Sequence, residues 1–174
     1  MFNIVPFISA DQELYKNSRL ESWREELYAF TTSYDDALTW TDQKWQQKIT
    51  DALNPEISHT YLAKNEAGVV GHIYAEFNTS AKRRHVLELK TMYVSPAYRR
   101  NGIAQALLQA ILDQLPKYPF LRKIGLSVAA TQEQAIRFYH KNGFVESGRL
   151  VQELQYNGAF FDQLLMDKFL TSNA

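Results

Sequence analysis

The fold is decided by residues 94–104, which read Val94-Ser95-Pro96-Ala97-Tyr98-Arg99-Arg100-Asn101-Gly102-Ile103-Ala104. The apolar run before this stretch predicts a strand that ends at Val94, and Pro96 prevents the strand from continuing. Apolar residues at helical spacing follow Gly102, which predicts a helix from there to about Leu115. They are Ile103, Leu107, Leu108, Ile111, Leu112 and Leu115. The stretch is therefore the turn of a strand–turn–helix unit.

The same turn has the features of a phosphate site. A helix that begins at Gly102 exposes backbone N–H groups without intrahelical partners and carries a partial positive charge at that end. Gly102 lets a ligand approach the backbone closely, Ala104 is small, and Arg99 and Arg100 add positive charge. Such a turn is suited to phosphate binding. The residues alone also fit an ordinary turn with two solvated arginines.

The rest of the chain predicts one domain, residues 1–174. Strands are expected at residues 2–8, 57–64, 69–77, 85–94, 123–128, 144–154 and 160–169, and helices at 11–30, 41–53, 102–115 and 132–141. Three successive strands in the middle predict an antiparallel meander, and the later alternation of helix and strand predicts some parallel pairing. We expect an α/β (α+β) fold with a single mixed, largely antiparallel sheet and helices on both faces.

Two local signals refine these boundaries. Asn157-Gly158 between the last two strands predicts a tight hairpin turn, because both residues tolerate a positive φ. Thr131, with Gln134 three residues later, predicts a capping box at the start of the fourth helix.

The composition narrows the class of protein. Lys and Arg (19) balance Asp and Glu (19), which opposes a nucleic-acid binder or a protein of anionic membranes. The chain has no cysteine, and its four histidines lack the spacing of metal ligands, so no metal site is expected. The first residues do not form a secretory signal, and no run approaches the roughly 20 apolar residues of a membrane span. We expect a cytoplasmic protein without membrane contact.

Two blocks of sequence resemble a known family. Residues 99–104 (RRNGIA) resemble the R/Q-x-x-G-x-G/A signature of the GNAT N-acetyltransferase superfamily. Residues 127–144 resemble that family's V-x-x-x-N-x-x-A-x-x-F/L-Y-x-x-x-G-F segment, except that Gln132 stands where Asn is usual. Residues 19–34 resemble, less specifically, the first helix and acceptor-pocket loop of one branch. The resemblance thus extends over nearly the whole chain.

The resemblance implies the GNAT fold and a site for acetyl-CoA, without a metal. Backbone amides of the loop would bind the pyrophosphate, and the strand before the loop would offer backbone groups to the pantetheine arm. The implied coenzyme-binding residues are Met92, Tyr93, Val94, Arg99, Arg100, Asn101, Gly102, Ile103, Ala104, Gln132 and Ala135.

The resemblance also implies a general acid. Tyr139 matches the family tyrosine seven residues after Gln132. A phenol with a pKa of about 10 is protonated at neutral pH and can donate a proton to a thiolate. The alternative is that Tyr139 is a core aromatic on an amphipathic helix.

The candidate general base is Glu88, at the strand position where some family members carry a catalytic glutamate. Strand alternation predicts that Glu88, Lys90, Met92 and Val94 share a face, so Lys90 could simply pair with Glu88. Transfer through a water chain is another possibility. Glu76 and His72 on the preceding strand are further candidate bases.

Aromatic residues gather in the first third of the chain. They are Trp23, Phe30, Tyr34, Trp40 and Trp45. They could form a helix core or line the acceptor pocket, and we expect Tyr34, Phe30 and Glu76 to bind the acceptor. The basic run at 82–84 could be a solvated loop, or could meet the 3′-phosphate of the coenzyme or an acidic substrate.

Two functions follow from these residues. One is direct transfer of an acetyl group from acetyl-CoA to a primary amine of a small molecule, peptide or protein. The other is a catalytically weak domain that senses acetyl-CoA or binds partners, which the Gln132 departure would favour. A nucleic-acid binder would rest only on residues 82–84. The amine stays unidentified, and the strand at 160–169 could serve as the edge of a homodimer.

Overall fold

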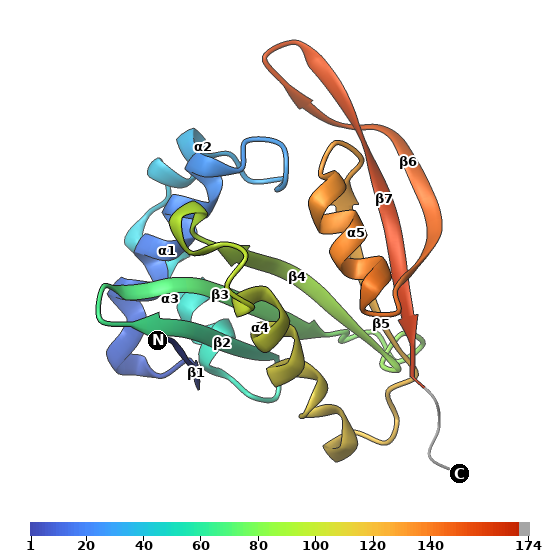
Figure 1. The fold of residues 1–174 in the computed structure, drawn as a ribbon, viewed down its shortest axis with the longest axis horizontal. Coiled ribbons are helices and arrows are strands. Elements are labelled where there is room, and N and C mark those ends of the chain that lie inside the picture. Colours follow the sequence, from blue (N-terminus) through green and yellow to red (C-terminus); the bar gives the residue numbers. More distant parts are fainter. Residues whose placement is uncertain (171–174) are drawn as a thin grey trace.

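The computed structural model describes residues 1–170; residues 171–174 of the predicted domain lie outside this part. Seven strands form one mixed sheet in the order β1-β2-β3-β4-β5-β7-β6 (Figure 1). The strands are β1 (Asn3–Pro6), β2 (Ser58–Asn65), β3 (Gly68–Phe77), β4 (Val86–Val94), β5 (Lys123–Ala129), β6 (Val145–Tyr156) and β7 (Ala159–Phe169). Among these strands only β4 and β5 pair in parallel, so the expected mixed, largely antiparallel sheet is confirmed.

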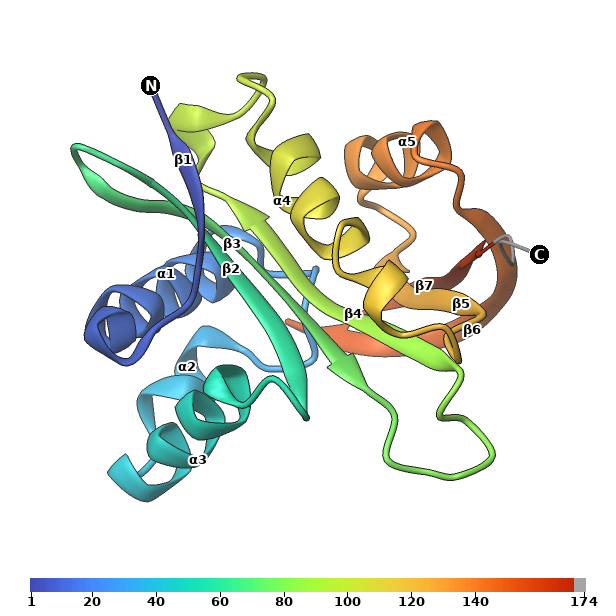
Figure 2. The same cartoon turned by 90° about the horizontal axis from the view of Figure 1, so that it is seen from below.

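Helices cover both faces of the sheet, as predicted. They are α1 (Gln12–Glu25), α2 (Tyr34–Leu38), α3 (Asp42–Leu53), α4 (Ile103–Leu112) and α5 (Glu133–Lys141). Helices α4 and α5 lie on one face, and α1, α2 and α3 lie on the other (Figure 2). Within residues 1–170, no helix is both long and apolar enough to cross a bilayer.

The main core lies between the sheet and the pair α4 and α5. Leu107, Leu108 and Ile111 of α4 are completely buried there. Burying one such side chain contributes roughly 1.5–3 kcal/mol. This packing holds the start of α4, and with it the turn after β4, in a fixed position against the sheet.

Lys90 lies in a β-bulge of β4. Tyr74 of β3 pairs with Thr91, whereas the next residue, Ala75, pairs with Leu89, so Lys90 has no partner on β3. A bulge adds one residue to a strand and increases its local twist. The side chains of β4 therefore change face at this point relative to a regular strand.

The bulge overturns the prediction that Glu88, Lys90, Met92 and Val94 share one face. Glu88 and Thr91 line the same cleft on the α1 side. Met92 and Val94 instead pack against the main core. The strand keeps its hydrogen bonds on both sides of the bulge, but every side chain after it changes face.

Strands β4 and β5 diverge toward the carboxyl end of β4. They pair only from Val86–Glu88 to Lys123–Gly125. Beyond these residues β4 stays with β3 and β5 stays with β7, so the sheet opens (Figure 1). On its β5 side, the last part of β4 therefore has no neighbouring strand among the described residues.

Some predicted boundaries were wrong. The first helix ends at Glu25, and α2 occupies part of the stretch expected to be irregular. Ser33 and Asp36 form a capping box that starts α2, and the sequence pattern had not predicted this helix. The capping box predicted at Thr131 and Gln134 is wrong: the N-cap of α5 is Gln132, which makes no side-chain capping hydrogen bond, and the helix begins at Glu133.

The end of the chain agrees better with the sequence. Asn157 and Gly158 have φ values of 48° and 78°, as the predicted hairpin turn between β6 and β7 requires. However, β7 lies inside the sheet between β5 and β6, so the strand at 160–169 is not a free edge. The edge strand on this side is β6.

Candidate active site

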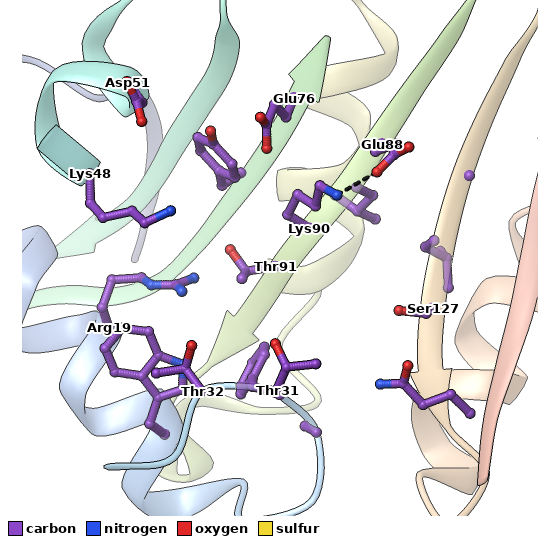
Figure 3. A pocket seen from close by; sticks show the side chains of 18 of the residues that line it. Arg19, Thr31, Thr32, Lys48, Asp51, Glu76, Glu88, Lys90, Thr91 and Ser127 are labelled. Atoms are coloured by element: carbon purple, nitrogen blue, oxygen red, sulfur yellow. Dashed lines mark hydrogen bonds and ion pairs between the residues drawn. The ribbon is translucent and has the colours of Figure 1, made fainter. Parts of the chain in front are cut away.

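A cleft of about 640 Å³ lies on the α1 and α3 face, along the line where β4 and β5 diverge (Figure 3). Residues of α1, α3, β3, β4, β5, β6 and β7 and of the loop after α1 line it. Its charged lining residues are Arg19, Lys48, Asp51, Glu76, Arg83, Glu88, Lys90, Lys123 and Asp167. The cleft can therefore hold a small polar molecule next to the opened edge of β4.

The turn between β4 and α4 presents backbone N–H groups to open space. Arg100 and Gly102 both adopt left-handed backbone conformations, with φ of 65° and 80°. The N–H groups of residues 100–104 donate no hydrogen bond to any described residue. A Cβ atom added to Gly102 would meet nothing within 4 Å. Successive free N–H groups at a helix start fit a phosphate or pyrophosphate group.

Arg99 does not extend into that space. Its Nε donates to the carbonyl of Val94 at 3.0 Å, and its Nη2 pairs with the carboxylate of Glu26, the residue that caps α1. The guanidinium thereby fastens the turn to the end of β4 and to α1. Arg99 stabilises the loop through its side chain rather than offering its charge freely.

Asn101 is hydrogen-bonded within the turn, whereas the side chain of Arg100 is exposed. The amide of Asn101 donates to the carbonyls of Tyr98 and Arg99, both at 3.2 Å, and so holds the turn in shape. Arg100 is exposed and forms no ion pair with a described residue. Of the two arginines, Arg100 is the one whose charge is available to a ligand.

Gln132 takes part in a contact that the sequence did not indicate. Its Nε2 donates to the carboxylate of Glu26 at 3.1 Å, the same carboxylate that pairs with Arg99. Glu26 thus links the turn after β4 to the start of α5. Ala135, one turn further along α5, is partly buried against the main core.

Tyr139 lies on α5 and is 8% exposed. Its ring packs edge-on against Phe138 and Phe144, at centroid distances of 5.5 and 5.4 Å. Its hydroxyl makes no hydrogen bond with any residue from 1 to 170. Burial raises the pKa of Tyr139, so the phenol stays protonated at neutral pH. The residue is both a core aromatic and an available O–H donor.

Glu88 is held by three neighbours. Arg83 Nη2 and Asn78 Nδ2 donate to one carboxylate oxygen at 2.7 and 3.1 Å, and Lys90 donates to the other. Burial alone would raise the pKa of Glu88, but the hydrogen bonds and charges of Lys90, Arg83 and Asn78 lower it. Glu88 is therefore ionised at neutral pH. Glu76 pairs with it across β3 and β4, and both line the cleft.

His72 lies outside the cleft. It is completely buried, its Nδ1 is hydrogen-bonded to Ser18 Oγ at 2.8 Å, and its ring lies beside those of Tyr15 and Tyr93. Burial, together with the charge of Arg19, lowers its pKa well below the usual value, so the ring is neutral. His72 joins α1 to the sheet.

The structure separates the expected acceptor-binding residues. Phe30 lines the cleft, but Tyr34 packs against the tryptophan cluster and is not among the lining residues. The tryptophans of this cluster, Trp23, Trp40 and Trp45, pack on one another with ring centroids 5.1–5.9 Å apart, and all three also line the cleft. The two interpretations of these aromatics are therefore compatible.

The basic run at 82–84 lies at the start of β4, whereas the phosphate-type turn follows its end. The nine residues of β4 separate the two by roughly 30 Å. Arg83 lines the cleft, and Arg84 lies 5.3 Å from the ring of Phe120. The run therefore does not adjoin the turn that would hold a pyrophosphate.

Sequence reasoning missed Arg19, Lys48 and Thr91, all of which line the cleft. A signal for Arg19 was present, because it stands four residues after Tyr15 and four before Trp23. Residues at this spacing share a helix face, and both aromatics are buried. No comparable signal identifies Thr91, whose direction depends on the bulge.

Comparison with known proteins agrees with this geometry. The model of the acetyltransferase (GNAT) family matches residues 18–144. An L-amino acid N-acetyltransferase of Escherichia coli is 26% identical over 72% of this chain and 75% of its own length. A spermidine N(1)-acetyltransferase of Vibrio cholerae is 35% identical over 44% of this chain and 47% of its own length.

Solved structures share the fold. A Salmonella typhimurium protein, solved with its cofactor acetyl-CoA, superimposes with a TM-score of 0.83 at 18% identity, over 100% of this chain and 96% of its own. A GNAT acetyltransferase of Streptococcus pneumoniae gives 0.81 at 20% identity, over 98% and 100% of the two chains. The family match, which covers well over half of the sequence, shows that the chain belongs to the acetyltransferase (GNAT) family and is an N-acetyltransferase.

Proposed function

We propose that the chain transfers an acetyl group from acetyl-CoA directly to a primary amine bound in the cleft. The observation that carries this proposal is the divergence of β4 and β5. The cleft lies along this divergence, and the turn with free N–H groups follows the diverging end of β4. An acceptor and a phosphate-bearing donor could thus meet at the same break in the sheet.

The N–H groups of residues 100–104 would hold the pyrophosphate of acetyl-CoA, with Arg100 adding charge. Met92, Tyr93 and Val94 would offer their backbone groups to the pantetheine arm, because this part of β4 lacks a neighbour on its β5 side. These contacts do not depend on side-chain identity. Acetyl-CoA supplies the thioester whose carbonyl carbon the amine attacks.

Tyr139 would donate its phenolic proton to the departing thiolate. Its hydroxyl supports this role, because it is protonated at neutral pH and has no hydrogen-bond partner among the described residues. Glu88 would accept a proton from the acceptor ammonium, since its carboxylate is ionised and lines the cleft. Its place in the lining of the cleft supports this role, whereas its lowered pKa makes it a weak base.

The test is the release of free thiol from acetyl-CoA across a panel of amines, polyamines, amino acids and peptides. We expect turnover with at least one class of acceptor, and mass spectrometry should find the acetyl group on its nitrogen. Binding of acetyl-CoA without turnover of any acceptor would contradict this proposal and favour the sensor function. Thiol release that is no faster than spontaneous hydrolysis with every acceptor would also contradict acetyl transfer.

A further inference from the structure

Arg19 places an unpaired positive charge in the cleft. It projects from α1, and its guanidinium carbon lies 4.6 Å from the centre of the Trp23 ring. Its Nη1 is completely buried and has no hydrogen-bond partner in the part of the chain that the structure describes. Within residues 1–170 no carboxylate forms an ion pair with it.

Such an arrangement is unusual in a folded protein. A buried charge is normally paired, because removing it from water costs free energy that only a partner restores. Burial lowers the pKa of Arg19, but a guanidinium remains protonated at neutral pH. A planar group with several free donors is the natural receptor for a carboxylate, which it can bind through two parallel hydrogen bonds.

The surroundings of Arg19 favour an anion. Lys48 of α3 lines the same end of the cleft, and the hydroxyl of Thr91 points into it, as Figure 3 shows. The Oγ1 of Thr91 is also buried and has no hydrogen-bond partner among residues 1–170, so it is a second unused donor. Two groups that independently lack partners thus border one space, together with Thr31 and Thr32 of the loop after α1.

No acidic residue of the cleft forms an ion pair with Arg19 or Lys48 within residues 1–170. Asp167 is paired with Lys123. Asp51, on α3 with Lys48, accepts a hydrogen bond from the uncharged Gln47 at 2.7 Å and forms no ion pair with a described residue. Glu88 is paired with Arg83 and Lys90. Glu76 forms no ion pair with a described residue and lies beside Glu88, at the other end of the cleft (Figure 3). Arg19 therefore has no ion-pair partner in the cleft, and two carboxylates of the cleft, Asp51 and Glu76, also form no ion pair with a described residue.

On the basis of the proposed acetyl transfer, we propose that the acceptor is a free amino acid whose carboxylate is bound by Arg19. The Thr91 hydroxyl donates a further hydrogen bond to the same carboxylate, and the amino group lies toward Glu88. The charge of Arg19, which has no ion-pair partner among the described residues, opposes a polyamine beside it, because a polyamine carries only positive charge. The unpaired charge of Arg19 thus favours an acceptor that carries a carboxylate.

The experiment compares acceptors that differ only in the carboxylate. From a panel of L-amino acids the best acceptor is chosen, and its amide and its decarboxylated amine are assayed beside it, with spermidine as the polyamine. We expect kcat/KM to be at least about tenfold higher for the amino acid, as a charged hydrogen bond implies. Arg19→Gln should remove this advantage by raising KM for the amino acid while leaving KM for the amide unchanged.

Arg24→Gln is the matched control, because Arg24 is on the same helix, is exposed and does not line the cleft. Unchanged affinity for acetyl-CoA verifies that Arg19→Gln is folded. Calorimetric titration of the amino acids onto the protein with bound coenzyme A gives a readout that needs no turnover. There too, binding should weaken in Arg19→Gln and not in Arg24→Gln.

Equal kinetics for the amino acid and its amide in the parent protein would overturn the proposal. An equal effect of Arg19→Gln on both acceptors would do the same. Turnover of spermidine or peptides without turnover of amino acids would overturn the carboxylate site but leave the proposed acetyl transfer standing. Amino acid binding lost in Arg19→Gln, in a protein that turns over no amine, would support the carboxylate site and refute the transfer.

Discussion

At the scale of single residues, Tyr139 and Glu88 lie in opposite environments. The Tyr139 side chain is buried, and its hydroxyl has no hydrogen-bond partner among the described residues. The carboxylate of Glu88 lies in the cleft and accepts hydrogen bonds from three donors. The first environment favours the protonated form of its group and the second favours the ionised form. One acid and one base, set apart by environment, are what acetyl transfer to an amine requires.

Tyr139→Phe should lower kcat by about a hundredfold, because the proton donor to the thiolate is lost. The ring keeps its packing on Phe138 and Phe144, so affinity for acetyl-CoA and thermal stability should change little. Stopped-flow thiol release and calorimetry measure the two effects. Tyr118→Phe, in the aromatic cluster with Phe77, is the control. Equal kcat in mutant and parent would remove Tyr139 as the acid.

Glu88→Gln should depress kcat/KM most at low pH. The pKa of Glu88 is lowered, so its carboxylate stays ionised below neutral pH, where the amine is almost wholly protonated and needs a base. As pH rises, free amine accumulates and the two proteins should converge. The pH–rate profile measures this, with Glu76→Gln in parallel. A constant ratio of mutant to parent rates across the pH range would contradict the base role.

At the scale of elements, the turn after β4 and the start of α5 are joined through Glu26 of α1. The carboxylate holds Arg99 in place but brings negative charge toward the proposed pyrophosphate site. It also engages the Gln132 amide, which the family resemblance assigns to the coenzyme. The link therefore competes with the ligand that the turn is suited to bind.

Glu26→Gln should tighten acetyl-CoA binding by up to about fivefold, the size expected for one partly exposed charge. The gain should fall as salt rises, because screening weakens the repulsion that the substitution removes. Glu25→Gln is the control, since Glu25 pairs with the exposed Arg24. Calorimetry at two salt concentrations measures both proteins. Weaker binding by Glu26→Gln would indicate that Glu26 positions the turn for the coenzyme instead.

At the scale of the whole molecule, the sequence predicted the layers better than the site. Asn157-Gly158 and the apolar spacing after Gly102 predicted the hairpin and α4, because local backbone preference and burial agree there. The bulge at Lys90 could not be predicted, since it depends on how β3 pairs with β4. It is the bulge that turns Thr91 toward the cleft and Met92 toward the core.

The sequence also did not predict which charged side chains would form ion pairs. Ion pairs between distant residues, such as Arg99 with Glu26, depend on which loops meet after folding. Arg19 could have been placed on a buried helix face from its spacing, but not recognised as unpaired. The hydrogen bond between Gln132 and Glu26 joins residues more than one hundred positions apart, and neither local sequence indicates it.

We propose that residues 94–104 hold acetyl-CoA. The most direct test of this proposal is a calorimetric titration of acetyl-CoA onto the parent, Gly102→Ala and Gly158→Ala. Gly102 and Gly158 have nearly equal φ values, 80° and 78°, and open space at Cβ, so the two substitutions impose similar backbone strain. We predict micromolar binding by the parent and Gly158→Ala, and binding at least about tenfold weaker by Gly102→Ala, because its methyl group enters the phosphate space. No binding by the parent at millimolar acetyl-CoA, or equal binding by all three proteins, would show that residues 94–104 do not hold the coenzyme.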